Sequence, residues 1–134
     1  MSKSSFEIVQ PKHWAAPKGY ANGIAAQGRQ VFIAGQVGWN AQAQFESDDF
    51  VAQVEQALKN VVDILAAAGC EPRHLVRLNW YVIDKTEYAA RQSEIGTVYR
   101  RVIGRHFPAM TLVVVAGLLE SRAKVEIEAT AVMD

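Results

Sequence analysis

The sequence has little of several features that mark specialised classes of protein. It contains a single cysteine, Cys70, so no disulfide can form within the chain. No apolar stretch reaches the roughly 18 residues that a membrane-spanning helix needs, and we expect no contact with a membrane. Its 14 basic residues equal its 14 acidic residues. A net charge of zero lacks the positive excess that favours nucleic acid, which we do not expect as a partner.

The composition indicates one folded domain with a sizeable core. The chain has 134 residues, a usual length for one domain, and 50% of them are hydrophobic. We therefore treat residues 1–134 as a single domain. The first residues lack the apolar segment of a signal peptide, and we expect a cytoplasmic protein. The histidines are scattered without the spacing of metal ligands, so no metal site is predicted.

The C-terminal part of the chain carries the strongest pattern. Residues 112–119 are apolar at nearly every position, which predicts a strand with both faces buried. In residues 125–132 apolar and polar residues alternate, as in a strand with one face toward the core. We predict that the two runs pair as a hairpin across a short polar break. The polar face of the second run carries Glu126 and Glu128, and a carboxylate held against apolar surface requires a partner or a function.

Strands and helices alternate along the rest of the chain. Strands are predicted at residues 31–37 and 75–83, with a weaker one before residue 28 and a short one at residues 6–9. Gly35 lies inside the first strong strand, where a glycine marks a bulge or a close approach of the backbone to another group. Apolar residues at steps of three and four predict a helix over residues 50–68, and a second helix is predicted over residues 86–103.

The resulting order, β-β-α-β-α-β-β, predicts an α+β sandwich in which two helices cover one face of a sheet. No helix is left to cover the other face, although the run at residues 112–119 is apolar on both sides. Another copy of the chain must then bury that face. The pattern therefore predicts a homo-oligomer.

Short motifs along nearly the whole chain, taken in their order and spacing, resemble those of one family. They are Gly19-Tyr20, Ala34-Gly35-Gln36, Gln56-Ala57-Leu58-Lys59-Asn60-Val61, Ala67-Ala68-Gly69, Phe107-Pro108-Ala109 and Val125-Glu126-Ile127-Glu128-Ala129. On these motifs the chain resembles the reactive-intermediate imine deaminase (RidA) family, also called the YjgF/YER057c/UK114 family.

This resemblance implies both an assembly and an activity. The implied fold is similar to chorismate mutase, a ferredoxin-like sandwich. Three copies form a homotrimer with a central β-barrel, and a small-molecule ligand binds in each cleft between subunits. The implied reaction converts 2-imino or 2-enamino acids to 2-keto acids and ammonia, with no metal or organic cofactor.

The resemblance also implies roles for particular residues. The glutamate that handles the attacking water falls on Glu126, which is therefore the catalytic candidate. The tyrosine that lines the cleft falls on Tyr20. Backbone groups that complete the substrate cradle fall on Gly35 and Leu112.

The position after the Pro-Ala pair departs from the family. Hydrolytic members carry an arginine there for the substrate carboxylate, and this chain has Met110. Losing a charge-assisted hydrogen bond costs about 1.5–3 kcal/mol, so 2-imino acids should bind poorly. A methionine wall suits an apolar or aromatic ligand, and Trp39 offers a stacking surface. Ser93 stands where hydrolytic members often have asparagine. Whether Arg77 or Arg105 replaces the missing charge is left open.

Three functions are compatible with these observations. The first is a small-molecule hydrolase of the imine or enamine deaminase type, with a substrate other than a 2-imino acid. The second is a non-catalytic trimer that binds a small metabolite. The third, an endoribonuclease, has least support because the chain is neutral and lacks a basic stripe. Glu126 also has a bland interpretation, as a rim carboxylate paired with Lys124, Arg122 or a cation of a neighbouring subunit. Glu128 is predicted to be a structural acceptor or ion-pair partner.

Overall fold

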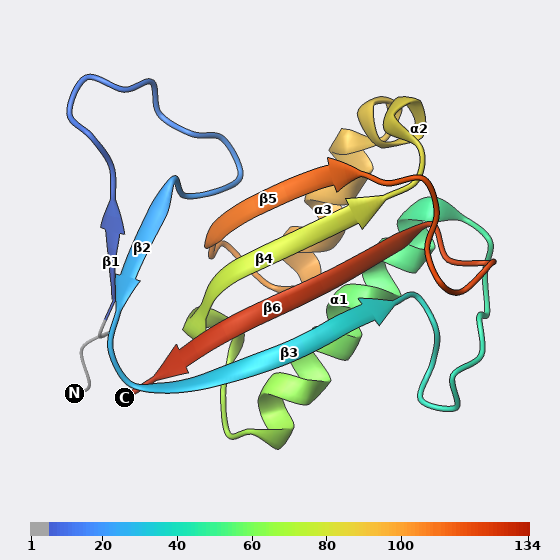
Figure 1. Ribbon diagram of the computed structural model, residues 1–134, viewed down its shortest axis with the longest axis horizontal. Helices are drawn as coiled ribbons and strands as arrows, with labels where there is room; N and C mark the ends of the chain where they lie inside the picture. Colours follow the sequence, from blue (N-terminus) through green and yellow to red (C-terminus); the bar gives the residue numbers. More distant parts are fainter. Residues whose placement is uncertain (1–5) are drawn as a thin grey trace.

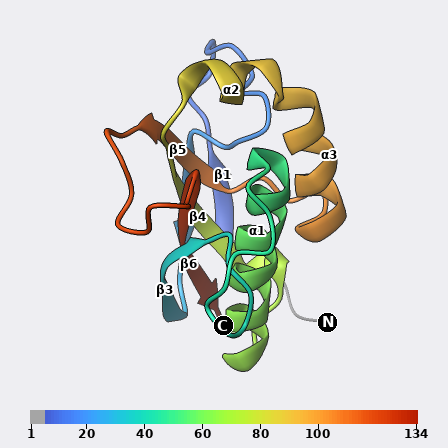
Figure 2. The ribbon, with the colours of Figure 1, turned by 90° about the vertical axis from the view of Figure 1, so that its right-hand side faces the viewer.

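The protein is a layer of helices packed on one face of a mixed sheet (Figure 1, Figure 2). The computed structural model describes residues 6–134, and residues 1–5 of the predicted domain lie outside this range. The strand order of the main sheet is β3-β6-β4-β5, and β1 and β2 form a separate two-stranded sheet. The predicted α+β class is confirmed. In the described range, no helix is both long enough and apolar enough to cross a bilayer.

The elements match the predicted order, with the short first strand present. They are β1 (Phe6–Val9), β2 (Gly23–Ala26), β3 (Arg29–Val37), α1 (Phe50–Ala67), the 3-10 helix η1 (Pro72–His74), β4 (Leu75–Val82), α2 (Lys85–Ala90), α3 (Gln92–Val102), β5 (Ala109–Val114) and β6 (Val125–Met133).

The first long helix forms where the sequence predicts it. The Asp49 side chain accepts a hydrogen bond from the backbone N–H of Ala52 at 3.0 Å, which caps the start of α1. The apolar stripe includes Val54, Leu58 and Val61, none of which is exposed to solvent. Burying this stripe against the sheet is the main source of stability for the helix.

The second helix is interrupted, which the sequence pattern does not show. Arg91 ends α2 and begins α3, with φ −118° and ψ 19°. Its guanidinium forms ion pairs with Glu94, three residues on, and with Asp49 at the start of α1. The Asp49 contact, which joins atoms 2.6 Å apart, lowers the pKa of that carboxyl. The break therefore coincides with a contact between two helices.

The predicted hairpin of residues 112–119 and 125–132 is wrong, because β4 lies between the two strands. β5 runs parallel to β4, and β6 runs antiparallel to β4 on its other edge. A parallel pair needs a long crossover, which α2 and α3 provide. β5 also ends at Val114, and Leu119 lies in the connection, where it is 94% exposed. The local pattern indicates two strands, but it does not show that a third strand separates them.

The sheet face away from the helices carries large side chains in contact with solvent. Phe32 on β3 is 73% exposed and Val113 on β5 is 41% exposed. Helices α1 and α3 both lie on the opposite face (Figure 2). Burial of the outer face by another copy of the chain stays a prediction.

A buried glutamine joins the start of α1 to the connection between β5 and β6. Gln53 is 1% exposed. Its side-chain amide donates to the carbonyls of Ser47 at 3.1 Å and Arg122 at 3.0 Å, and its oxygen accepts from the N–H of Lys124 at 2.8 Å. A Cβ on Gly38 would lie 2.6 Å from the Cβ of Gln53, so the backbone of β3's end packs directly against it. Three chain segments therefore depend on one amide.

We expect Gln53→Leu to lower the free energy of unfolding by about 1–3 kcal/mol, because it leaves the N–H of Lys124 buried without a partner. Urea denaturation measures this change. Gln44→Leu is the control, since Gln44 is exposed, and it should change stability by less than about 0.5 kcal/mol. Equal losses in the two variants would contradict the structural role of Gln53.

Candidate functional site

The predicted site residues lie on opposite faces of the sheet within one chain. Met110 pairs in register with Leu78, and its side chain packs against the core beneath the helices. Glu126 pairs with Tyr81 on β4 and points to the other face, because its neighbours Val125 and Ile127 are fully buried. Met110 and Glu126 therefore share no cavity within the described chain. A common pocket requires a second copy.

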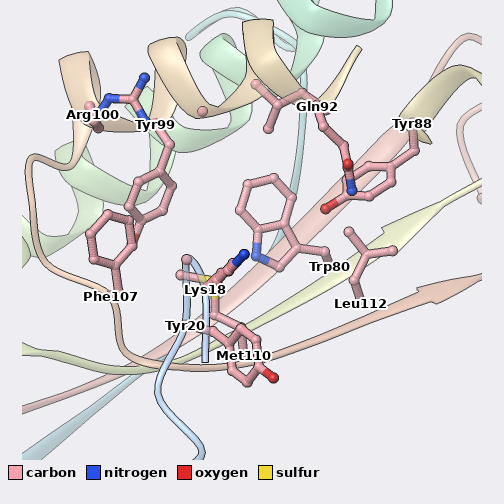
Figure 3. Close-up of a pocket in the computed structure, with 13 residues that line it drawn as sticks. Lys18, Tyr20, Trp80, Tyr88, Gln92, Tyr99, Arg100, Phe107, Met110 and Leu112 are labelled. Atoms are coloured by element: carbon pink, nitrogen blue, oxygen red, sulfur yellow. The ribbon is translucent and has the colours of Figure 1, made fainter. Parts of the chain in front are cut away.

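The helix-side region is a cavity of about 490 Å³, which is large enough for a small-molecule ligand (Figure 3). It lies between α3, β5 and the segment that leads into β2, and we call it the aromatic pocket. Its lining residues are Lys18, Gly19, Tyr20, Trp80, Tyr88, Gln92, Ile95, Gly96, Tyr99, Arg100, Phe107, Met110 and Leu112.

Three of the predicted site residues line this pocket: Tyr20, Met110 and Leu112. Met110 and Leu112 lie two residues apart on β5, so their side chains point to the same face. Tyr20 comes from the N-terminal segment, which is fixed beside the start of β5. There the N–H of Ala21 donates to the carbonyl of Pro108 at 3.0 Å. This backbone contact brings together residues that are distant in sequence.

One wall of the pocket consists of aromatic rings in contact. Tyr99 stacks on Phe107 with ring centroids 5.4 Å apart and planes 14° apart, and its ring lies 6.4 Å from that of Trp80. The Tyr99 hydroxyl donates to the carbonyl of His106 at 2.6 Å. Burial raises the pKa of Tyr99, so the phenol stays neutral. The wall therefore presents mainly the edges and faces of aromatic rings to a ligand.

Two cations line the pocket that sequence reasoning did not identify. They are Lys18 and Arg100. The two arginines considered earlier lie elsewhere: Arg77 donates to Asn79 at 3.2 Å, and Arg105 lines a different cavity beside β1. A signal for Arg100 was present, because Gln92, Gly96 and Arg100 recur every four residues and so form one stripe of α3.

The outer-face region joins Gly35 to Glu126. The register between β3 and β6 shifts between Ile33 and Gln36, which is the bulge predicted at Gly35. A Cβ on Gly35 would lie 1.9 Å from Oε2 of Glu126. The carboxylate thus rests directly on the glycine backbone, and both the predicted bulge and the predicted close approach are confirmed.

The two carboxylates of β6 differ in their surroundings. Glu128 accepts hydrogen bonds from the Tyr81 hydroxyl and from the Asn79 amide, which confirms its role as a structural acceptor. The Tyr81 bond, followed by the Asn79 bond, lowers the pKa of Glu128. The side chain of Glu126 has no hydrogen bond or ion pair with any residue in the range 6–134.

Neither of the two partners that the bland interpretation offers within the chain pairs with Glu126. Arg122 pairs with Asp48 at 2.9 Å and lies over the ring of Phe45. Lys124 likewise makes no ion pair with Glu126 in the described structure. A half-buried carboxylate without a partner is unusual unless it has a function or meets a partner from another molecule.

Trp39 and Ser93 lie outside the aromatic pocket of the single chain. Trp39 packs on Phe45 with ring centroids 5.9 Å apart, and its carbonyl accepts from the Asn60 amide at 2.8 Å. Ser93 is exposed on α3, while its neighbour Gln92 lines the pocket. Their predicted roles in substrate binding stay predictions that a neighbouring copy would have to complete.

The chain is a small α+β domain with an open pocket on its helix side and an unpaired carboxylate on its outer sheet face. Comparison of the sequence with known families identifies the family of this domain. The family model described as Endoribonuclease L-PSP matches residues 11–133. The chain therefore belongs to this family, the RidA or YjgF/YER057c/UK114 family that its motifs resemble.

Individual relatives agree with this assignment. A 2-iminobutanoate/2-iminopropanoate deaminase of Capra hircus is 34% identical over 105 residues, covering 78% of this chain and 73% of the relative. A crystal structure of a protein of unknown function of the conserved Rid family from Yersinia pestis is 30% identical, with a TM-score of 0.86 and coverage of 96% and 99% of the two chains. E. coli TdcF with bound serine is 27% identical, with a TM-score of 0.68 and coverage of 96% and 99%.

The contact between Gly35 and Glu126 is testable with a double-mutant cycle. We expect Gly35→Ala to destabilise the fold, because the new methyl displaces the carboxylate. In a Glu126→Ala background the same change should be less destabilising, with a coupling free energy of about 0.5–3 kcal/mol. Gly117→Ala is the control, since no atom lies within 4 Å of a Cβ there. Additive effects in thermal unfolding would rule out the contact.

Proposed function

We propose that the protein is a homotrimer that hydrolyses a small imine or enamine, with Glu126 as the catalytic residue. The observation that carries this proposal is the state of the Glu126 carboxylate. It rests on Gly35 without a hydrogen-bond or ion-pair partner in the described chain, whereas Glu128 on the same strand is fully engaged. A carboxylate in this state is available to accept a proton from water.

The reaction needs few groups. A protonated imine carbon is already electrophilic, so the site has to orient one water molecule beside it. As the water oxygen bonds to this carbon, Glu126 accepts the water proton. Glu126 then passes this proton to the nitrogen. As the C–N bond breaks, the hydroxyl proton of the adduct returns to the Glu126 carboxylate, and ammonia and a carbonyl compound leave. These steps use water and the protein's own groups and no cofactor.

The substrate should differ from those of the named relatives. The Capra hircus relative is named for 2-imino acids, and TdcF was crystallised with serine. Each of these compounds carries a carboxylate on the carbon that bears the nitrogen. Met110 lines the pocket here and cannot donate a hydrogen bond to that group. We propose a substrate without a carboxylate at this position.

The separation of the two regions supports an assembly of more than one copy, and three copies is the number that the family resemblance implies. Glu126 and the aromatic pocket lie on opposite faces of one sheet, so a complete site needs Glu126 from one copy and the pocket from another. The large exposed side chains Phe32 and Val113 lie on the Glu126 face and favour its burial in an interface.

The second candidate is a non-catalytic trimer that binds a metabolite. It is favoured by Met110 and Ser93, which stand where the resemblance implies an arginine and an asparagine in hydrolytic members. A compound that raises the melting temperature and is recovered unchanged would favour binding over catalysis. The endoribonuclease activity in the family description gains little support from a chain with zero net charge.

Light scattering should give three times the chain mass of 14.8 kDa. Phe32→Asp places a charge in the proposed interface and should yield monomers without imine hydrolysis. Leu119→Asp is the control, because Leu119 lies in the connection between β5 and β6 and outside the sheet face proposed as the interface, and this variant should remain trimeric. A wild-type monomer would contradict the shared site.

Coupling an amino-acid oxidase to the protein and following the decay of the imine measures the activity on 2-imino acids, which should be weak. Met110→Arg should raise it by about tenfold or more, because it adds a charge-assisted hydrogen bond to the carboxylate. Leu119→Arg adds the same charge away from the pocket and should change nothing.

In the Met110→Arg background, Glu126→Gln should remove the gained activity, since the amide cannot accept the water proton. Glu128→Gln is the matched control, because its amide oxygen still accepts from Asn79 and Tyr81, and most of the activity should remain. Unchanged turnover in the Glu126→Gln variant would remove Glu126 from the mechanism.

A further inference from the structure

The aromatic pocket carries positive charge that nothing nearby neutralises. Its lining includes Lys18 and Arg100 and no carboxylate. Neither cation forms an ion pair or a hydrogen bond within residues 6–134. Other cations on the same helices are paired: Arg101 meets Glu55 at 2.9 Å, and Arg91 meets Asp49 at 2.6 Å. Within one chain the pocket therefore has a positive potential that favours an anionic ligand, and the two cations still outnumber the one carboxylate, Glu126, that the proposed assembly would add.

The direction of Arg100 depends on a glycine of the same helix. A Cβ on Gly96 would lie 3.2 Å from Nη1 of Arg100, so the guanidinium folds back along α3 toward its N-terminus. Figure 3 shows Arg100 on the helix side of the pocket, near Tyr99, while Met110 and Leu112 lie on the strand side. The guanidinium and the methionine thus occupy different parts of one cavity, whereas Lys18 lies nearer to Tyr20 and Met110 than to Arg100 in the view of Figure 3.

The surface between these two sides is lined mainly by aromatic rings. The stacked rings of Tyr99 and Phe107 continue into Trp80, and the Tyr99 hydroxyl is already used by the carbonyl of His106. Met110 adds a polarisable thioether, which makes favourable contacts with aromatic rings. A planar, unsaturated ligand body fits this lining better than a short polar one.

We infer that the aromatic pocket binds an organic anion whose carboxylate is separated from its reactive carbon by a flat apolar body. The body lies on the aromatic wall and Met110, the carboxylate meets Arg100, and the positive charge of Lys18 adds to the attraction. The position of the ligand's reactive carbon rests on the proposed function. Binding of the ligand's apolar body and of its carboxylate by the pocket does not. This arrangement distinguishes the ligand from a 2-imino acid, in which the carboxylate is bonded directly to the imine carbon.

Titration calorimetry on the full-length protein tests this inference with 3-phenylpropanoate, its uncharged amide, and propanoate, which lacks the ring. The acid should bind about tenfold more tightly than either of the other two compounds, because only the acid uses both the wall and the cations. Its advantage over the amide should shrink when the salt concentration rises from 0.05 to 0.5 M, since exposed charges are screened.

Two substitutions and a matched control test which cations bind the carboxylate of the ligand. Lys18→Gln and Arg100→Gln should each weaken binding of the acid about three- to tenfold and leave binding of the amide unchanged. Arg101→Gln removes the same charge from the next residue, which pairs with Glu55 outside the pocket, and should leave both affinities unchanged.

Equal affinities for the acid and the amide would overturn the inference, and so would the absence of binding by the acid. A loss in Arg101→Gln as large as that in Arg100→Gln would also overturn it, because the effect would then be one of net charge. Charge-dependent binding of the acid together with no hydrolysis of any imine would sustain this inference while refuting the proposed function.

Discussion

The parallel pairing of β4 and β5 decides where every part of the site lies. A parallel neighbour needs a crossover, and α2 and α3 supply it while covering the same face as α1. The register that sets Met110 beside Leu78 turns it toward those helices, into the aromatic pocket. β6 is left with the other edge of β4, where burial of Ile127 forces Glu126 to the opposite face. The requirements of one core therefore separate the two groups.

This separation offers a reason why the outer face of the sheet carries both apolar and polar side chains. A chain that worked alone would need only polar residues there, yet Phe32 and Val113 are exposed beside the polar pair of Glu128 and Tyr81. Such a mixture suits an interface, in which apolar contacts supply affinity and satisfied polar groups fix the orientation. Glu126 lies on the same face without a partner, so the proposed contact between subunits would also complete the site.

The sequence predicted what depends on neighbours along the chain and missed what depends on distant ones. Helix α1 could be predicted because its cap at Asp49 and its apolar stripe are local features. Gly35 could be interpreted because a glycine inside a strong strand has few physical explanations. The hairpin was wrong because strand pairing is decided by the β4 crossover. The break at Arg91 involves Asp49, 42 residues away, and no pattern around Arg91 reports that contact.

The sequence pattern did not identify the two cations of the aromatic pocket, for a related reason. Their positions also bear on how substrate preference changes within one fold. Lys18 and Arg100 are exposed, so no burial pattern marks them. Met110 stands where the family resemblance implies an arginine, while Arg100 supplies a positive group on the helix side of the pocket and Lys18 a second one. A shift of charge within a pocket changes which ligand binds best, because specificity is a difference between affinities. The sheet and helices need not move for this, since Lys18 and Arg100 are surface side chains whose exchange leaves the core intact.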